Sequence, residues 1–213
     1  MQNREQVLGC YEKAAGDYAG KYMNELEGKH LDRILLEAFA RENKDKGRCI
    51  DLGCGPGQTT QFLFEHGLTQ ITGTDLSPAM VETAKKLNPH ISFETADMLQ
   101  LHYDPQHFAS AIAFYSIVHF SYEQAGIAFK EIARVLQPGA HFLFSFHIGD
   151  AVVHIDEFLG HKVNIDFYFF ETAKITALLA ASGFELIDVL ERQPYTAAEY
   201  PSTRAYIWAA KKP

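Results

Sequence analysis

The stretch Asp51-Leu52-Gly53-Cys54-Gly55-Pro56-Gly57 decides the fold. An apolar run precedes it and a helical pattern opens directly after it, so we predict a strand that turns into a helix. Glycines in such a turn let the backbone approach a ligand closely, although tight strand-to-helix turns also use glycine for conformation alone. The spacing here is G-x-G-x-G, whereas the dinucleotide fingerprint is G-x-G-x-x-G. The turn therefore predicts a ligand site and disfavours nicotinamide and flavin.

Short apolar runs alternate with helical patterns along the chain, which is typical of a parallel sheet wrapped by helices. Residues 1–46 are predicted to be helical, and residues 148–169 are predicted to be rich in loops. Ser77 followed by Pro78, and Ser121 with Gln124, predict two helix starts. Strands are expected at residues 48–53, 70–75, 91–95, 109–115, 141–147, 184–191 and 204–211.

Composition is that of an ordinary globular domain: 213 residues, 47% hydrophobic and 22% charged. The formal charge of −8 argues against a nucleic-acid partner, because there is no basic excess to neutralise phosphates. Three cysteines without a CxxC pair favour reduced thiols and a cytoplasmic location. We expect no signal peptide and no membrane span, since no basic-then-apolar start and no run of 18 apolar residues is present.

Two acidic residues follow the next predicted strands. Asp75 ends the second strand, where a carboxylate is placed to accept hydrogen bonds from ribose hydroxyls. It could instead cap the following helix, but Ser77 is available for that role. Asp97 follows the third strand, where it can accept a hydrogen bond from the exocyclic amine of adenine while Met98 packs on the adenine ring. With the glycine turn, these residues predict an adenosine site across three successive strand ends.

At this point the sequence resembles the class I S-adenosylmethionine-dependent methyltransferases, in particular those that act on small molecules. The matching residues are 49–57, 73–77, 96–98, 109–119 and 134–139. The resemblance implies an α/β fold: a seven-stranded, mostly parallel sheet whose antiparallel last strand lies beside the fifth, with helices on both faces. It also implies S-adenosylmethionine as cofactor and S-adenosylhomocysteine as product. We expect one domain over residues 1–213, with a helical lid at 1–46 and an insert at 148–169 that roofs the acceptor.

Carried over position by position, the resemblance implies a set of cofactor-binding residues. The methionine and ribose parts would lie against Asp51, Gly53, Cys54 and Gly55, and the ribose would bind Asp75. The adenine would lie among Leu76, Met80, Asp97 and Met98. The transferable methyl group would lie near Tyr115 and Ser116. The lid would contribute Tyr11 and Tyr18, which share one helical face; packing of these rings on the core is the alternative.

Acceptor and catalysis are less determined by the sequence. His119 and His147 follow the fourth and fifth strands and are candidate general bases, with a structural role equally open for His119. His154 and His161 lack the spacing of a metal pair, so we predict no metal. Aromatic and acidic residues in 148–169 suggest a small acceptor with an apolar part and a cationic group.

The expected activity is methyl transfer from S-adenosylmethionine to a small-molecule acceptor, by a monomer or homodimer. The Asn-Pro-Pro-Tyr or Asp-Pro-Pro-Tyr segment, which in the family marks attack by planar nitrogens of nucleic acid or glutamine, is absent; Ala113-Phe114-Tyr115-Ser116 stands there. Two alternatives remain open: a catalytically silent cofactor-binding regulatory module, and an NAD(P)-dependent oxidoreductase, which the glycine spacing disfavours.

Overall fold

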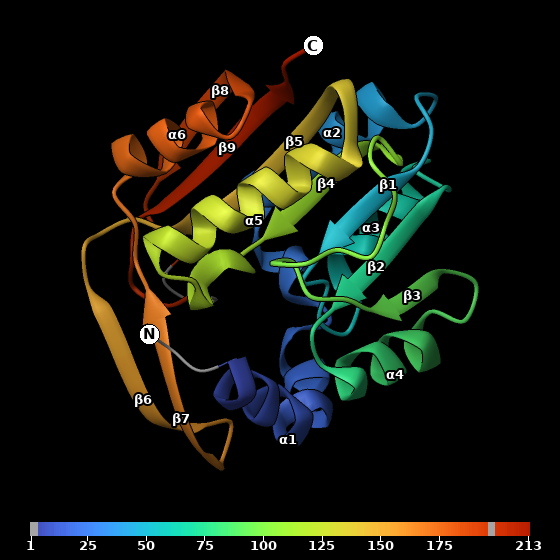
Figure 1. Ribbon diagram of the computed structural model, residues 1–213. Coiled ribbons are helices and arrows are strands. Elements are labelled where there is room, and N and C mark those ends of the chain that lie inside the picture. The colour runs from blue at the N-terminus through green and yellow to red at the C-terminus, as the bar shows by residue number, and fades with distance from the viewer. Residues whose placement is uncertain (1–3, 196–198) are drawn as a thin grey trace.

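A seven-stranded sheet with the order β3-β2-β1-β4-β5-β9-β8 forms the centre of the computed structural model, which describes residues 4–195 and 199–213 (Figure 1). Strand β9 is antiparallel to its neighbours β5 and β8, and the remaining neighbours pair in parallel. The predicted fold class is confirmed. The strands are β1 Cys49–Leu52, β2 Ile71–Asp75, β3 Ser92–Thr95, β4 Phe108–Phe114, β5 Leu136–His147, β8 Phe184–Arg192 and β9 Arg204–Lys211.

Helices cover both faces of this sheet. Successive strand residues point to opposite faces, so Phe142 and Phe144 of β5 belong to the buried cluster that also holds Phe129, whereas Leu143 belongs to the cluster that also holds Leu36. The central strands are therefore buried on both sides, as parallel strands require. The helices are α1 Arg4–Tyr22, η1 Glu25–Gly28, α2 His30–Asn43, α3 Gln58–Glu65, α4 Pro78–Leu87, η2 Ile117–His119, α5 Tyr122–Val135 and α6 Thr172–Ala181.

Two helix starts follow the predicted capping chemistry. The hydroxyl of Ser77 accepts a hydrogen bond from the backbone N–H of Met80, and Pro78 occupies the first position of α4. Ser121 and Gln124 form a complete capping box at the start of α5. Both helices begin beside the edge of the sheet that carries the glycine turn, so these caps fix the loops around the ligand site.

The Phe93 ring of β3 supports the glycine turn from within the fold. A Cβ at Gly73 of β2 would lie 2.5 Å from Phe93 Cδ1, and a Cβ at Gly57 would lie 2.9 Å from its Cζ. Gly57 also has a φ of +91°, a conformation that side-chain-bearing residues rarely adopt. The ring thus fills the space that the two glycines leave open, and it supports the turn against β2.

Residues 148–169 are not loop-rich, which corrects the prediction. They form a hairpin of β6 Val152–Phe158 and β7 His161–Tyr168, which Figure 1 shows beside α1. Leu159 and Gly160 join the strands, with φ values of +51° and +81°. Positive φ at both central positions is what a two-residue hairpin turn of type I′ requires, but leucine is not one of the residues that normally indicate such a turn. Strand β5 also starts earlier than predicted, at Leu136.

Replacing Gly73 by alanine is expected to destabilise the protein by about 1–3 kcal/mol, because the new methyl group would overlap the Phe93 ring in a filled core. Urea unfolding measures the effect. Gly16→Ala in α1 is the matched control, since a Cβ there meets no atom within 4 Å, and it should stabilise the helix by up to about 1 kcal/mol. Equal unfolding midpoints for the Gly73 variant and the wild type would contradict the packing described for Phe93.

Candidate functional site

A cavity of about 420 Å³ lies at the carboxyl ends of β1, β2, β4 and β5. This edge of an open α/β sheet is where ligands bind, since the strand order reverses there between β1 and β4. The structure brings all the sequence-predicted site residues onto the wall of this one cavity. They are Tyr11, Tyr18, Asp51, Gly53, Cys54, Gly55, Asp75, Leu76, Met80, Asp97, Met98, Tyr115, Ser116, His119 and His147. Their individual contacts with a cofactor remain predictions.

Asp75 joins the glycine turn to the end of β2. Its carboxylate accepts hydrogen bonds from the backbone N–H of Gly55 and of Ser77, both at 2.9 Å. Burial raises the pKa of Asp75, and these two N–H donors oppose that rise. Ser77 caps α4, as the sequence predicted, and these two N–H groups give Asp75 a structural role as well. A carboxylate has about four acceptor positions, so it retains room for hydroxyl donors from the cavity.

Asp51 and Gly53 form the floor of the turn. The hydroxyl of Thr60 donates to Asp51 at 2.6 Å, and burial raises the pKa of Asp51 to about 7. A Cβ at Gly53, whose φ is +72°, would lie 2.3 Å from Ser116 Cβ. The side chain that glycine omits here would collide with the Ser116 side chain. Ser116 Oγ is buried and has no hydrogen-bond partner among the described residues.

Both carboxylate oxygens of Asp97 already have hydrogen-bond partners. Its Oδ1 accepts from the backbone N–H of Leu99 at 2.9 Å, and its Oδ2 accepts from Arg4 Nε at 2.6 Å. Arg4 opens α1 and is 55% exposed. The predicted adenine-binding carboxylate is thus in contact with the first turn of the N-terminal helix.

Helix α1 and the β6–β7 hairpin form the roof of the cavity. The Glu12 carboxylate accepts from Ser77 Oγ at 2.6 Å and from the backbone N–H of Ala79 at 2.9 Å, which ties α1 to the start of α4. The rings of Tyr11 and Tyr18 lie 6.0 and 6.2 Å from the ring of Phe158 in the hairpin. The tyrosines therefore line the cavity and meet the hairpin, in place of packing into the main core.

His119 is a connector. Its Nδ1 lies 3.1 Å from the backbone carbonyl of Asp166, which can only accept, so Nδ1 carries the proton. Its Nε2 therefore accepts from the hydroxyl of Tyr11, at 2.7 Å. Burial lowers the pKa of His119 to about 4, so the ring is neutral near pH 7. Both nitrogens hold roof elements in place, which leaves neither free for a substrate.

His147 has a different environment at the end of β5. Its Nδ1 lies 2.7 Å from Ser202 Oγ, and its ring lies between those of Tyr115 and Phe169, at 5.5 and 5.2 Å. Burial lowers its pKa to about 4, with a further contribution from the positive charges of Arg204 and Lys29. Within residues 4–195 and 199–213, Nε2 makes no hydrogen bond. This neutral imidazole therefore has one nitrogen available to a ligand.

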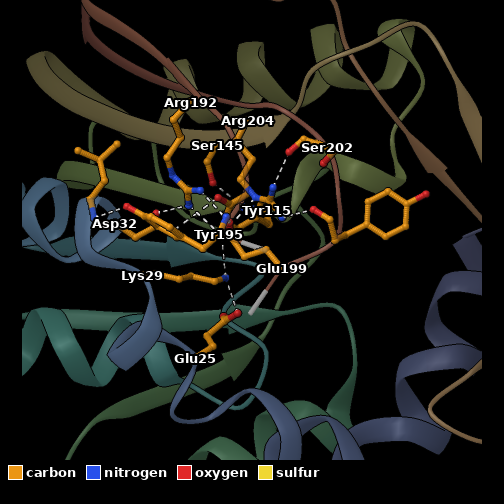
Figure 2. Close-up of polar contacts among 12 residues, drawn as sticks. Glu25, Lys29, Asp32, Tyr115, Ser145, Arg192, Tyr195, Glu199, Ser202 and Arg204 are labelled. Atoms are coloured by element: carbon orange, nitrogen blue, oxygen red, sulfur yellow. Dashed lines mark hydrogen bonds and ion pairs between the residues drawn. The ribbon is translucent and has the colours of Figure 1, made fainter. Parts of the chain in front are cut away.

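A buried charged cluster, which the sequence did not reveal, borders the same end of the cavity (Figure 2). Asp32 of α2 is fully buried and accepts from Arg192 at 2.7 Å and from Tyr206 at 2.6 Å. The Tyr206 hydroxyl also lies 2.6 Å from that of Tyr115. Tyr115 has a φ of +52°, so this cluster holds a strained residue in place. No local motif announces these contacts, because they join residues up to 174 positions apart.

The acidic residues of the segment 148–169 do not line the cavity. Asp150, Asp156 and Glu157 are exposed and do not line it, and Asp166 pairs with His154 at 2.7 Å. These acidic residues therefore give no support to a cationic group on the acceptor. The residues of this segment that line the cavity are Val153, Ile155, Phe158, Phe167 and Phe169, so the surface that the segment turns to the cavity is apolar.

Among the described residues, no group of three His, Cys, Asp or Glu side chains is arranged to hold a metal ion. No described helix has the length and apolar character needed to cross a membrane.

Comparison with known proteins gives a consistent result. Residues 49–139 match the family model of a methyltransferase domain. An O-methyltransferase of Penicillium expansum, cnsE, is 30% identical over 172 residues, which are 75% of this chain and 60% of that protein. A trans-aconitate 2-methyltransferase of Methylobacterium nodulans is 35% identical over 113 residues, 51% of this chain and 39% of that protein. The chain spans 60–64% of the length of the three O-methyltransferases that it matches.

Among solved structures, the magnesium protoporphyrin IX methyltransferase of Synechocystis PCC 6803 with bound SAM superimposes with a TM-score of 0.75. The match covers 100% of this chain and 98% of that one at 16% identity, and it establishes the common fold.

The buried, neutral His119 should make stability depend on pH. Its pKa is about 4 in the folded protein and near 6.5 in an unfolded chain, so the unfolded state binds the proton more readily. Its stabilisation is therefore complete above about pH 6.5 and is lost as the pH falls towards 4. The loss amounts to about 3 kcal/mol.

Urea unfolding between pH 4 and 7 measures this dependence. His119→Gln should show a shallower fall in the free energy of unfolding than the wild type over this range. The exposed His90→Gln is the control and should follow the wild type. Parallel curves for the wild type and the His119 variant would show that burial of His119 does not govern acid stability.

Proposed function

We propose that the chain, whose residues 49–139 match the family model of a methyltransferase domain, transfers the methyl group of S-adenosylmethionine to a hydroxyl or carboxylate oxygen of a small acceptor. S-Adenosylhomocysteine is the product. One observation carries the proposal: a glycine cradle, two strand-end carboxylates and an available imidazole nitrogen gather on one cavity wall. The relatives named O-methyltransferase support oxygen as the acceptor atom.

The cavity residues fit this cofactor. Gly53 and Gly55 have positive φ and bring backbone to the wall, and Asp75 retains acceptor positions for the ribose diol. Ser116 Oγ and Gln58 Oε1 are buried on the wall without a hydrogen-bond partner among the described residues, as expected of groups that await a ligand. The adenine would be held by Leu76, Met80, Asp97 and Met98, and the methionine and ribose parts by Asp51, Gly53, Cys54 and Gly55.

The bound cofactor supplies an activated methyl group on a sulfonium, so the protein has mainly to orient the acceptor and exclude water. Tyr11, Tyr18 and Phe158 close the roof above the cavity. Tyr115 and Ser116 lie at the end of β4, between the glycine turn and the acceptor end. His147 Nε2 takes the proton of an acceptor hydroxyl; a carboxylate acceptor needs no base.

The two histidine candidates thus separate. His119 is the structural connector of the roof, and His147 is the proposed base. The helical segment from α1 to α2 serves as a lid and the hairpin as the acceptor roof, in one domain. The apolar hairpin surface suits a small acceptor with an apolar body, and the net charge of −8 disfavours nucleic acid. Three buried thiols, Cys10, Cys49 and Cys54, suit the reducing cytoplasm.

Removal of the Asp75 carboxylate tests the cofactor site. Asp75→Ala should weaken S-adenosylhomocysteine binding by about 1.5–3 kcal/mol, or roughly 10- to 150-fold, because hydrogen bonds to a charged group are lost. Isothermal titration calorimetry measures the affinity, and circular dichroism checks the fold. Asp104→Ala, an exposed aspartate outside the cavity wall, is the matched control. Unchanged affinity in the Asp75 variant would remove Asp75 from the site.

Removal of the His147 imidazole tests the base. His147→Gln should lower kcat by about 100- to 10,000-fold for a hydroxyl acceptor, the range typical of a lost general base. S-Adenosylhomocysteine affinity should stay near that of the wild type. In the wild type, kcat/KM should decline on the acid side with an apparent pKa of about 4, where His147 becomes protonated. Full turnover in the variant, with His90→Gln as control, would exclude His147 as base.

A further inference from the structure

Ser202 is the direct partner of His147. Its Oγ lies 2.7 Å from His147 Nδ1, and the residue is only 9% exposed. Ser202 stands two residues before β9, far from every motif of the sequence. Because a neutral imidazole carries its proton on one nitrogen, a partner that accepts from Nδ1 leaves Nε2 with a lone pair. The Ser202 hydroxyl is in the position to act as that partner.

Arg204 fixes the backbone on which Ser202 sits. It is 3% exposed, and its guanidinium donates to the carbonyl of Ser202 at 2.6 Å and to that of Tyr200 at 3.0 Å. The backbone N–H of Ser202 also donates to the Tyr200 carbonyl, at 2.8 Å. The Ser202 side chain therefore projects from a backbone that one buried cation holds on both sides, and its direction toward His147 is set.

Glu199 in turn holds Arg204 and the segment around it (Figure 2). Its buried carboxylate accepts two hydrogen bonds from Arg192, at 2.7 and 2.8 Å, and one from the backbone N–H of Tyr195, at 2.8 Å. Arg204 Nε lies 3.3 Å away and Lys29 Nζ 3.8 Å away. One carboxylate thus joins three cations that come from the ends of β8 and β9 and from the start of α2.

We propose that Ser202 is a positioning residue that accepts the Nδ1 proton of His147 and so presents the lone pair of Nε2 to the acceptor. This inference rests on the proposed function only for its effect on turnover. The tautomer itself is a property of the protein alone. In the described part of the chain, Ser202 is the one hydrogen-bond partner of His147 Nδ1. Without its hydroxyl, nothing described there keeps the proton on Nδ1.

Nitrogen NMR of protein labelled in its histidines tests the inference directly. The signals of His147 are assigned by their absence in His147→Gln. The wild type should show His147 protonated on Nδ1. Ser202→Ala should lose this preference, and Ser202→Thr, which keeps a hydroxyl, should restore it. A wild-type spectrum with the proton on Nε2 overturns the proposal, and so does an Nδ1 proton that survives in Ser202→Ala.

Turnover with a hydroxyl acceptor completes the test. Ser202→Ala should lower kcat by about 10- to 100-fold, as expected for a misoriented base, with little change in acceptor KM or S-adenosylhomocysteine affinity. Ser202→Thr should stay close to the wild type. A changed tautomer with unchanged kcat would support the role of Ser202 in fixing the proton and refute His147 as base. The two inferences therefore fail separately.

Discussion

The hydrogen bond from the Gly55 backbone to the Asp75 carboxylate is the contact on which the cavity depends. It joins the turn after β1 to the end of β2, and these two strands are parallel neighbours in the sheet. Below the turn, the Phe93 ring fills the space beside Gly57, and above it Ser116 packs against Gly53. A larger residue at either glycine would move the turn, and with it the position of Asp75 relative to the cavity. Packing within the protein therefore requires glycine at positions 53 and 57.

The sequence predicted those parts of the molecule whose signal is local. The Ser77 and Ser121 caps could be predicted because capping depends on residues close together in the sequence. The glycine turn and the acids after successive strands could be assigned to one site because parallel strands bring their carboxyl ends to one edge of the sheet. The hairpin was missed because Leu159 stands where a turn residue is expected. The direction of its acids was missed because without a strand assignment there is no alternation to separate the two faces. The cluster of Asp32, Arg192 and Glu199 was invisible because only the finished sheet brings these residues together.

This cluster illustrates a general cost of buried charge. Three cations, Lys29, Arg192 and Arg204, meet three carboxylates, Glu25, Asp32 and Glu199. Desolvation offsets much of the attraction within such a group, so the group contributes little to net stability. Its main effect is to restrict the positions of the side chains around it. The cluster acts at one end of the cavity, where Tyr115 has a positive φ and His147 is neutral.

The roof is attached in a different way from the rest of the fold. Helix α1 buries only Cys10, Ala14 and Ala15, and polar groups such as Arg4, Glu12 and Tyr11 make its named hydrogen bonds to the cavity rim. A helix held by few apolar contacts detaches at a free energy well below that of global unfolding. Local detachment of α1 would expose the cavity while the sheet stays intact. Because Arg4 is bonded to Asp97, a ligand that binds this carboxylate would compete with the docking of α1, so the affinity of such a ligand and the order of the roof would be thermodynamically linked.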